Sequence, residues 1–448
     1  MKRPQIRRLG VLAAALSAVV ALAACGAGGR GSSGDTGADG ERTASDVGVT
    51  ETSIKLGSHY PLTGVAAPGY SDIPLGYEAY LKMVNANGGV HGRQIEWVYK
   101  DDGYNPTRTT EVVNELVLKD QVFAIAGGLG TPTHGAVVDF LNSEKVPDMF
   151  VASGSLAWGD DPKAKPYTFG FTPDYEIEGK IIGDWIKKNK PDAKVGLFLQ
   201  ADDLGADGEK GVRQFLDKEI VSVQRYTSGN TDVAPQLAAL QADGADFVIA
   251  FNTPSYTALS QLQAMRLNYK PTWYYSNVGS DTKLVGSLLE RFSEGSVKDS
   301  SALEGTLTTD YIAEVESADG KGWPELWQKI WAEYGEQGKP LTNYHIYGMS
   351  QAYAVVMALQ EAGPNPTRDG LVKVMEEKGA SWKGPWVAPF RFSATSHLGL
   401  GGLQMVELKG EKTEPIGPLL TTNIGDAPIV EGESQLGTPP ENGIPPAG

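Results

Sequence analysis

The sequence predicts an α/β protein with two doubly wound parallel-sheet lobes joined by a three-segment hinge. Short apolar segments typical of strands alternate with helical segments from residue 54 onward. This alternation breaks off near residue 170 and then starts again, and three extended connectors separate the series. Because such alternation is typical of right-handed β-α-β units, the two series indicate two parallel sheets.

Length and charge restrict the class of protein. A chain of 448 residues is too long for one compact core and favours two domains. Its 55 acidic and 39 basic residues give a net charge of −16, so we expect no nucleic-acid partner, which would need a basic face. Acidity of this kind keeps a protein soluble, and we expect a monomer. The five histidines are scattered and there is one cysteine, so neither a metal nor another cofactor is expected.

Residues 1–24 have the pattern of a signal peptide. Four basic residues lie among the first eight, and a continuous apolar stretch follows from residue 9 to residue 24. Cys25, the sole cysteine, comes directly after this stretch. Residues 25–52 are rich in Gly, Ser, Asp and Thr and are expected to form a flexible tether.

Residues 54–64 open the first series of elements. A short apolar strand stops abruptly in a loop that contains Pro61, Thr63 and Gly64. Ligands of an open parallel sheet lie beyond the carboxyl ends of its strands, so residues 58–64 are the first candidate binding loop. An ordinary strand-to-helix connection is the alternative. The further elements expected here are helix 75–87, strand 95–99, helix 105–119, strand 122–126, a helix ending at 144 and strand 148–152.

The second series follows the extended connector 167–173. Its expected elements are helix 177–189, strand 195–199, helix 208–218, strand 221–226, helix 233–242, strand 247–251, helix 256–266 and strand 272–276. A second connector, 303–311, leads to helices at 323–334, 344–361 and 368–378, and a third, 389–393, precedes an apparent hairpin up to residue 409. Residues 413–448 are rich in Pro and Gly and are expected to form a loosely held tail.

Several stretches in combination resemble one family. These are IKLGSHYPLTG at 54–64, GYEAYLKMVNANGGVHG at 76–92, the Asp101-Asp102 pair with Asn105-Pro106, and NYHIYGMSQAYAVVMALQEAG at 343–363. Together they resemble the solute-binding proteins of bacterial ABC importers, in the branched-chain amino-acid group with the type I clamshell fold of periplasmic binding proteins. The resemblance implies lobe one at 53–170 with 312–388, and lobe two at 171–311 with 389–412.

The sequence Leu22-Ala23-Ala24-Cys25 resembles the lipobox of bacterial lipoproteins. The resemblance implies cleavage before Cys25 and a lipid on the new amino-terminal cysteine. The protein would then be held at the outer face of the cell membrane. The alternative for Cys25 is a free thiol after an ordinary secretion signal.

The resemblance also implies ligand contacts in lobe one. The family holds an amino-acid carboxylate with backbone N–H groups and hydroxyls from two loops, a use that suits Gly-rich loops running into helices. The matching positions are Leu129, Gly130, Thr131, Thr133, Ser153, Gly154 and Ser155. Helix capping is the alternative role for Thr131 and Ser155. Tyr70 matches an aromatic cover for the ligand, and Trp158 is a second aromatic candidate.

The chain departs from the family where an ammonium group would bind. The family's amino-acid binders place a glutamate where this chain has Asn277, and often a tyrosine where it has Leu204. Because an unpaired buried ammonium costs several kcal/mol, either Asp202 or Asp203 supplies the charge, or the ligand has no ammonium group, like an amide or an aromatic acid. Solvated loop acids are the alternative reading of both aspartates. Asn252 and Thr253 are further polar candidates.

The sequence therefore predicts a lipid-anchored, extracytoplasmic receptor that delivers a small polar solute to the permease subunits of an ABC transporter, with no enzymatic activity. A solute-sensing receptor of the same fold that signals to a partner protein is the first alternative. A secreted lipoprotein hydrolase is the second, but the chain has no G-x-S-x-G motif for a nucleophile. His59 is expected to lie in the cleft loop and to affect ligand binding.

Overall fold

The computed structural model describes residues 42–298, 300–315, 317 and 320–446. The predicted signal peptide, Cys25 and the tether up to residue 41 lie outside these residues. None of the described helices combines the length and the hydropathy that crossing a bilayer requires.

The first sheet has five parallel strands in the order β2-β1-β3-β4-β5. They are β1 (Ser53–Tyr60), β2 (Gln94–Asp101), β3 (Ala124–Ala126), β4 (Asp148–Val151) and β5 (Thr168–Gly170). Along β3, Ala124 and Ala126 join the apolar cluster on one face, and Ile125 joins the cluster on the other. Both faces are therefore buried, as a doubly wound sheet requires.

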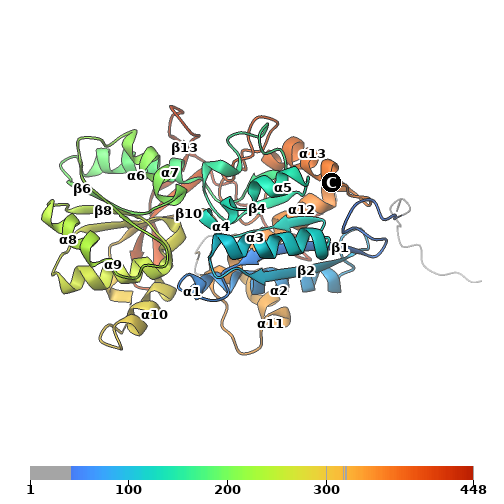
Figure 1. The fold of residues 1–448 in the computed structure, drawn as a ribbon, viewed down its shortest axis with the longest axis horizontal. Helices are drawn as coiled ribbons and strands as arrows, with labels where there is room; N and C mark the ends of the chain where they lie inside the picture. Colours follow the sequence, from blue (N-terminus) through green and yellow to red (C-terminus); the bar gives the residue numbers. More distant parts are fainter. Residues whose placement is uncertain (1–41, 299, 316, 318–319, 447–448) are drawn as a thin grey trace, which may run out of the picture. The chain divides into compact units, whose positions relative to one another are not determined.

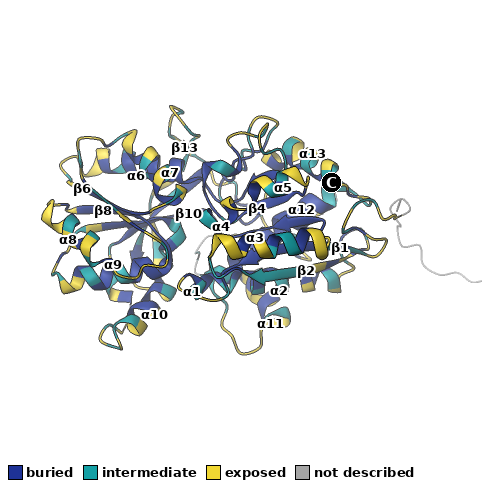
Figure 2. Ribbon diagram, viewed as in Figure 1, coloured by how far each residue is buried: buried dark blue, intermediate teal, exposed yellow. Residues whose placement is uncertain are grey.

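Helices from two separate parts of the chain cover this sheet (Figure 1). The early helices are α1 (Ala67–Tyr70), α2 (Ile73–Ala86), α3 (Pro106–Asn114) with a π-helical turn at Glu115–Lys119, α4 (Thr131–Gly135) and α5 (Val138–Ser143). The late helices are α11 (Trp323–Tyr334), α12 (Asn343–Ala362) and α13 (Arg368–Lys378). Of these, α11 and α12 pack against α2. In Figure 2 the central strands β4, β6 and β8 are buried, and many exposed residues lie on the outer helices.

The second sheet has eight strands in the order β13-β12-β11-β10-β9-β8-β6-β7. Strands β7 (Ile220–Tyr226), β6 (Val195–Gln200), β8 (Phe247–Phe251), β9 (Thr272–Tyr275) and β10 (Leu307–Asp310) are parallel. Strands β11 (Gly402–Lys409), β12 (Lys412–Thr421) and β13 (Val430–Gly432) continue it antiparallel. The sheet is therefore mixed: after helices α11 to α13 the chain returns as β11, antiparallel to β10, and β12 and β13 then follow as consecutive antiparallel strands.

The helices of the second sheet agree with the expected series in type, with two differences. They are α6 (Tyr175–Asn189), α7 (Asp203–Arg213), α8 (Ala234–Ala242), α9 (Pro254–Arg266) and α10 (Thr282–Phe292). Helix α7 begins five residues before its expected start because the Asp202 carboxylate accepts a hydrogen bond from the Leu204 N–H at 3.0 Å. Helix α10 was not predicted; Asp281 caps it by accepting from the Leu284 N–H at 2.7 Å.

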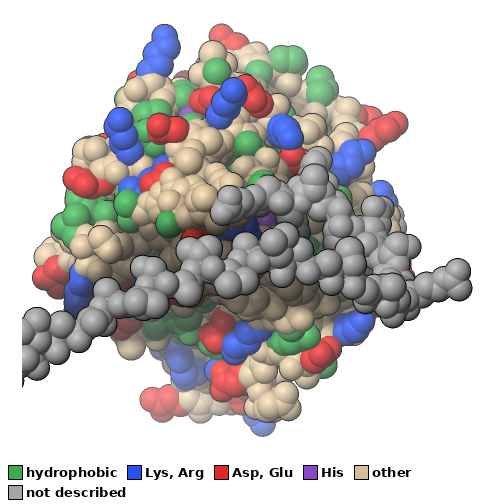
Figure 3. Space-filling model, turned by 90° about the vertical axis from the view of Figure 1, so that its right-hand side faces the viewer, with side chains coloured by type: hydrophobic (Ala, Val, Ile, Leu, Met, Phe, Trp, Pro, Cys, Tyr) green, Lys and Arg blue, Asp and Glu red, His purple; other side chains and the backbone are tan. Residues whose placement is uncertain are grey.

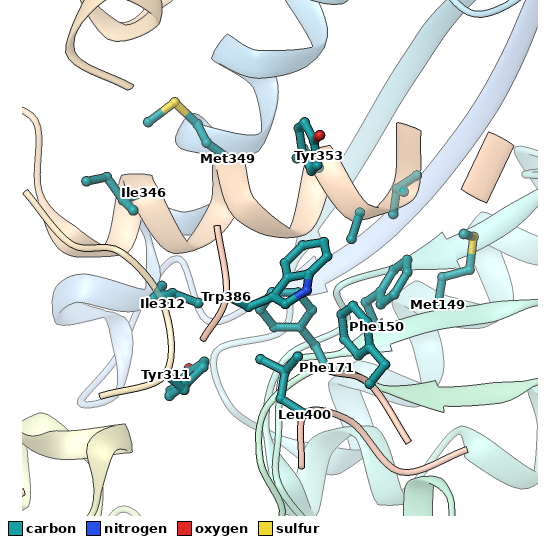
Figure 4. Packing of buried hydrophobic residues seen from close by; sticks show 14 of the residues in the cluster. Met149, Phe150, Phe171, Tyr311, Ile312, Ile346, Met349, Tyr353, Trp386 and Leu400 are labelled. Atoms are coloured by element: carbon teal, nitrogen blue, oxygen red, sulfur yellow. The ribbon is translucent and has the colours of Figure 1, made fainter. Parts of the chain in front are cut away.

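Three connecting segments run side by side between the sheets. The Val387 N–H donates to the Tyr311 carbonyl at 2.9 Å, and the Leu400 N–H donates to the Phe171 carbonyl at 3.1 Å. Figure 4 shows Phe171, Trp386 and Leu400 from these segments packed with Phe150 of β4. The connectors thus share one apolar core with the first sheet.

The expectation of a loosely held tail is wrong. Residues 412–421 and 430–432 are strands of the second sheet. Farther on, the Trp323 indole N–H donates to the Gly437 carbonyl at 2.7 Å, and the Tyr80 hydroxyl donates to the Gly443 carbonyl at 2.8 Å. The low apolar content of this segment did not predict its attachment, because the segment is held mainly by hydrogen bonds to its backbone.

A buried lysine holds the turn between β12 and β13. Lys180 is 1% exposed, and its ammonium donates to the carbonyls of Asn423, Gly425 and Ala427 at 2.7 to 2.8 Å. The Gly425 N–H in turn donates to the Glu176 carboxylate at 2.7 Å. This turn is therefore fastened to the first turns of α6.

The end of the expected flexible tether also packs onto the fold. The Arg42 guanidinium donates to the Gly92 carbonyl at 2.8 Å, and the Ser45 hydroxyl donates to the Pro366 carbonyl at 2.6 Å. Val49 is 3% exposed. Within the described part of the tether, residues 42–52, the expectation of flexibility is wrong.

Candidate functional site

A cavity of about 510 Å³ lies where loops of the first sheet face loops of the second. Its walls include residues that follow β2, β3 and β4 on one side and β6 and β9 on the other. Carboxyl ends of parallel strands gather such loops, and the volume lies within the range of small-molecule sites. The geometry is that of a ligand-binding cleft.

Three hydroxyls form a polar corner of this cavity. Thr131 Oγ1 and Ser153 Oγ share a hydrogen bond of 2.8 Å, and Tyr175 Oη lies 3.3 Å from both oxygens. Burial raises the pKa of Tyr175 to about 12, so its hydroxyl stays protonated. The turn needs Gly130, with a φ of 105°, because a Cβ there would lie 2.4 Å from Thr133 Oγ1. The corner can both donate hydrogen bonds to a ligand and accept them.

About half of the predicted ligand-binding residues line the cavity. Those in its wall are Tyr70, Leu129, Gly130, Thr131, Ser153, Leu204 and Asn277. Those outside it are Thr133, Gly154, Ser155, Asp203, Asn252 and Thr253. Both lobe-one loops thus contribute to the cavity, but through fewer side chains than the resemblance implies.

The residues outside the wall have structural contacts. Thr133 Oγ1 donates to the Leu129 carbonyl at 2.6 Å. Ser155 Oγ accepts from the Ala157 N–H at 3.1 Å, so the capping role expected as an alternative for Ser155 is present, and it also donates to Asp203 at 3.3 Å. These bonds hold the loops that carry the cavity residues.

The remaining polar candidates are also engaged away from the cavity. Asn252 Oδ1 accepts from Thr257 Oγ1 at 3.1 Å. Asp202 caps α7 and accepts from the Gln200 amide at 2.6 Å. Thr253 is the residue before α9 and is 3% exposed. The structure therefore places neither Asp202 nor Asp203 where it could pair with a ligand in the cavity.

The expectation that His59 lies in a cleft loop is wrong, because β1 continues to Tyr60. His59 is fully buried in a chain of four side chains. Its Nδ1 lies 2.8 Å from Asp102, its Nε2 lies 3.0 Å from His134 Nδ1, and His134 Nε2 lies 2.7 Å from Asp148. Burial lowers the pKa of His59, although the bond to Asp102 opposes this shift. Trp158 packs edge-on against His134 at 5.1 Å and does not line the cavity.

Contacts between the two sides close the rim of the cavity. Tyr70 Oη donates to the Val278 carbonyl at 3.3 Å, and Ser255 Oγ donates to the Val65 carbonyl at 2.8 Å. A further bond between the two sides runs from the Leu156 N–H to Asp207 at 2.9 Å. The two sides therefore touch directly, and the cavity volume is that of a closed arrangement.

Sequence reasoning missed most of the aromatic wall. Tyr104, Tyr175, Tyr311, Tyr344 and Tyr347 all line the cavity. Tyr344 and Tyr347 lie three residues apart near the start of α12, a spacing that places them on one face of a helix. That spacing was the available signal; Tyr311 lies in a connector without periodicity.

Three carboxyl groups, which we call the acidic wall, were also missed. Asp281, Asp310 and Glu314 line the cavity and are half-buried. The Asn343 side-chain amide donates to Asp281 at 3.0 Å and to Glu314 at 3.2 Å. Thr413 Oγ1 donates to Asp310 at 2.8 Å. Burial raises the pKa of Asp310 to about 6, and burial with the nearby Asp310 and Asp281 raises the pKa of Glu314 well above its usual range.

A fourth carboxyl group lies directly behind Asn277. Glu178 is fully buried, and its carboxylate accepts from the Asn277 N–H at 2.8 Å, from Tyr274 Oη at 2.8 Å and from Ser276 Oγ at 2.9 Å. Burial raises its pKa. It supports the loop after β9 and does not reach the cavity.

The described residues contain no group of three His, Cys, Asp or Glu side chains that could hold a metal ion. On the face that Figure 3 presents, acidic and basic side chains are interspersed. The chemistry of the site is that of hydroxyls, tyrosine rings and carboxyl groups around one cavity.

The loops at the carboxyl ends of the two sheets face each other across one cavity, and three adjacent connectors join the sheets. This arrangement defines the class of two-lobed solute-binding proteins. The chain belongs to the periplasmic binding protein family, whose model matches residues 53–413.

Curated relatives and solved structures agree with this family. The chain is 26% identical over 307 residues to the Leu/Ile/Val-binding protein homolog 7 of Brucella suis biovar 1, covering 65% of this chain and 74% of that protein. A branched-chain amino acid ABC transporter structure from Thermus thermophilus with bound valine is 21% identical, with a TM-score of 0.71, over 83% of this chain and 97% of that chain. A fatty acid ABC transporter substrate-binding protein from Thermomonospora curvata is 24% identical, with a TM-score of 0.70, over 92% and 100%. The structures establish the type I periplasmic binding protein fold.

Proposed function

We propose that this protein is the extracytoplasmic solute-binding lipoprotein of an ABC importer and captures a small polar solute in the cavity between its lobes. One observation carries the proposal: residues that follow strands of both sheets line one closed cavity, with the hydroxyls of Thr131 and Ser153 in its wall. Lobe one is assigned to 53–170 with 312–388, and lobe two to 171–311 with 389–412.

Capture follows from contacts that only the closed form offers. A solute held by Thr131, Ser153 and Tyr175 on one side and by the loop at Asn277 on the other stabilises closure by its differential affinity for that form. The three connectors absorb the movement. Tyr70, bonded to Val278 across the rim, acts as a cover over the bound solute.

The solute proposed first is a branched-chain amino acid or a molecule of similar size, such as an amide or an aromatic acid. The names of the Brucella relatives point to Leu, Ile and Val, whereas the Thermomonospora neighbour is named for fatty acids. The hydroxyl corner suits a carboxylate or an amide in each case, because both can accept hydrogen bonds from hydroxyls.

Lipidation of Cys25 and delivery to permease subunits complete the proposal. The signal sequence and the lipobox-like residues before Cys25 support a lipid anchor at the outer face of the cell membrane. We propose a monomer with no enzymatic activity, since its task is to bind a solute and release it to the permease.

A thermal-shift screen of the protein against branched-chain amino acids, other amino acids, amides, aromatic acids and fatty acids tests the function. A true ligand at about a hundredfold excess over its dissociation constant adds about 2.7 kcal/mol to the free energy of unfolding, a clear shift of the melting temperature. If no solute in the panel shifts the melting temperature, the proposal is contradicted. If only fatty acids do, the class of protein stands and the polar solute is wrong.

A further inference from the structure

The acidic wall concentrates negative charge in one part of the cavity. The Asn343 amide touches both Asp281 and Glu314, and Asp310 adds its charge to that of Glu314. Three carboxyl groups close together repel one another when ionised, and burial raises the pKa of each. An arrangement of this kind is costly for the empty protein unless protons or a cation neutralise it.

A buried polar group without a described partner also lines the cavity. Thr172 is 8% exposed, and its hydroxyl is buried without a hydrogen-bond partner within the described part of the chain. Tyr311, which follows Asp310 directly and is 9% exposed, lines the cavity as well. Because buried polar groups are nearly always hydrogen-bonded, the Thr172 hydroxyl indicates a missing polar partner.

Aromatic rings complete this part of the cavity. Tyr344 contacts Tyr70 edge-on at 5.8 Å between ring centroids, and both line the wall. Ring faces of tyrosines attract ammonium and guanidinium groups. The carboxyl groups and the tyrosine rings therefore both favour a cationic ligand group.

Other charged groups also line the cavity. Lys283 and Lys412 line the cavity, and Lys283 opposes the rise in the pKa of Asp281 that burial causes. Asp72 is a further lining carboxyl group, with Lys339 opposing the rise in its pKa that burial causes. After burial itself, Asp310 raises the pKa of Glu314 more than Asp281 does.

We propose that the acidic wall binds a positively charged end of the solute, so that the ligand carries an ammonium or guanidinium group as well as the polar head at Thr131 and Ser153. This inference rests on the proposed function and specifies its solute. It explains how a chain with Asn277 in place of a glutamate binds a cationic group: Asp281, Asp310 and Glu314 supply the charge instead. For a solute whose carboxylate-bearing head lies at the hydroxyl corner, this second, cationic end makes the ligand class a basic amino acid or an ω-amino acid, in place of the branched-chain amino acid to which the relatives' names point.

Matched pairs of probes isolate the contribution of the cationic end. The pairs are L-lysine with L-norleucine, L-arginine with L-citrulline, and 6-aminohexanoate with hexanoate. In each pair the second compound lacks the terminal charge. In calorimetry, we expect the cationic member of at least one pair to bind about tenfold to a hundredfold more tightly than its uncharged partner. The reason is that hydrogen bonds to charged groups contribute more free energy than hydrogen bonds between neutral groups.

Isosteric variants locate the effect. Glu314→Gln and Asp310→Asn are expected to remove most of the discrimination within that pair, whereas Asp72→Asn, a control at another carboxyl group of the cavity, keeps it. Calorimetry of the unaltered protein in two buffers of different ionisation enthalpy gives a readout that does not depend on any variant. Binding of the cationic probe is expected to release protons, because it displaces those held by carboxyl groups of raised pKa.

The outcomes separate this inference from the proposed function. If the uncharged members of all pairs bind as tightly as the charged ones, the inference is wrong although solute binding stands. The same holds if Glu314→Gln and Asp72→Asn distinguish the charged from the uncharged probe equally well. If aliphatic amino acids, amides or aromatic acids bind and no cationic probe does, the inference is also wrong and the proposed function stands. If no compound in any panel binds, the proposed function fails and the inference with it.

Discussion

The His345→Gln substitution tests how protonation of one histidine at the start of α12 changes the stability of the fold. His345 occupies the third position of this helix in a capping box with Thr342. The Thr342 N–H donates to His345 Nδ1 at 3.1 Å, and the His345 N–H donates to Thr342 Oγ1 at 3.3 Å. Nδ1 must therefore keep its lone pair, and protonation there breaks the cap. Gln is a normal residue at this position of a capping box and does not titrate.

The size of the effect follows from the pKa of His345. Burial of a side chain that is 1% exposed, and then Lys339, lower this pKa from 6.5 to about 4. The unfolded chain therefore binds more protons between these values, and stability falls as the pH drops below 6.5. Since one pKa unit corresponds to about 1.36 kcal/mol, the loss between pH 7 and pH 5 is about 2 kcal/mol.

Urea unfolding at pH 7 and at pH 5 of the unaltered protein and of His345→Gln measures this loss. The variant is expected to lose about 2 kcal/mol less than the unaltered protein between the two pH values, because all other titrating groups are shared. Equal pH dependence in the two proteins would show that His345 is protonated in the fold without cost, and would refute the reasoning.

Three further predictions concern the packing and the closed form. Gly76→Ala places a Cβ 2.0 Å from the His345 carbonyl oxygen, where α2 packs against α12, so overpacking is expected to lower the free energy of unfolding by about 1 to 3 kcal/mol in urea titrations. An unchanged free energy of unfolding would contradict the close approach. Lys180→Met removes three hydrogen bonds to backbone carbonyls, and hydrogen exchange is expected to become faster in residues 422–427; exchange as slow as in the unaltered protein would show that other contacts hold this turn. Tyr70→Phe removes one hydrogen bond across the rim and is expected to raise the rate of ligand release by about twofold to tenfold in stopped-flow measurements. An unchanged rate would exclude a role of this bond in closure.

The alternation of strands and helices was predictable because it depends on local periodicity. The expected helices 323–334 and 368–378 agree with α11 and α13 to the residue, since each has a clear apolar face and a clear start. Helix α7 was placed too late because its first turns contain Gly205 and Gly208, which weaken a helical pattern. The tail was misjudged because its backbone, rather than its side chains, makes the contacts.

The candidate site was predictable only where a loop follows a strand. Leu129, Thr131 and Ser153 lie at strand ends, and the resemblance located them. The acidic wall could not be found in this way. Asp281 caps a helix that was not predicted, and Glu314 lies in a connector, so only the three-dimensional fold brings them together.

Calorimetry of the best ligand with the unaltered protein, Thr131→Val and Thr253→Val tests the central claim most directly. Both threonines were candidates from the sequence, but only Thr131 lines the cavity. We expect Thr131→Val to weaken binding by about tenfold or more, and Thr253→Val to change it by less than about twofold. Equal affinities for Thr131→Val and the unaltered protein, or equal losses in both variants, would contradict a binding site in this cavity.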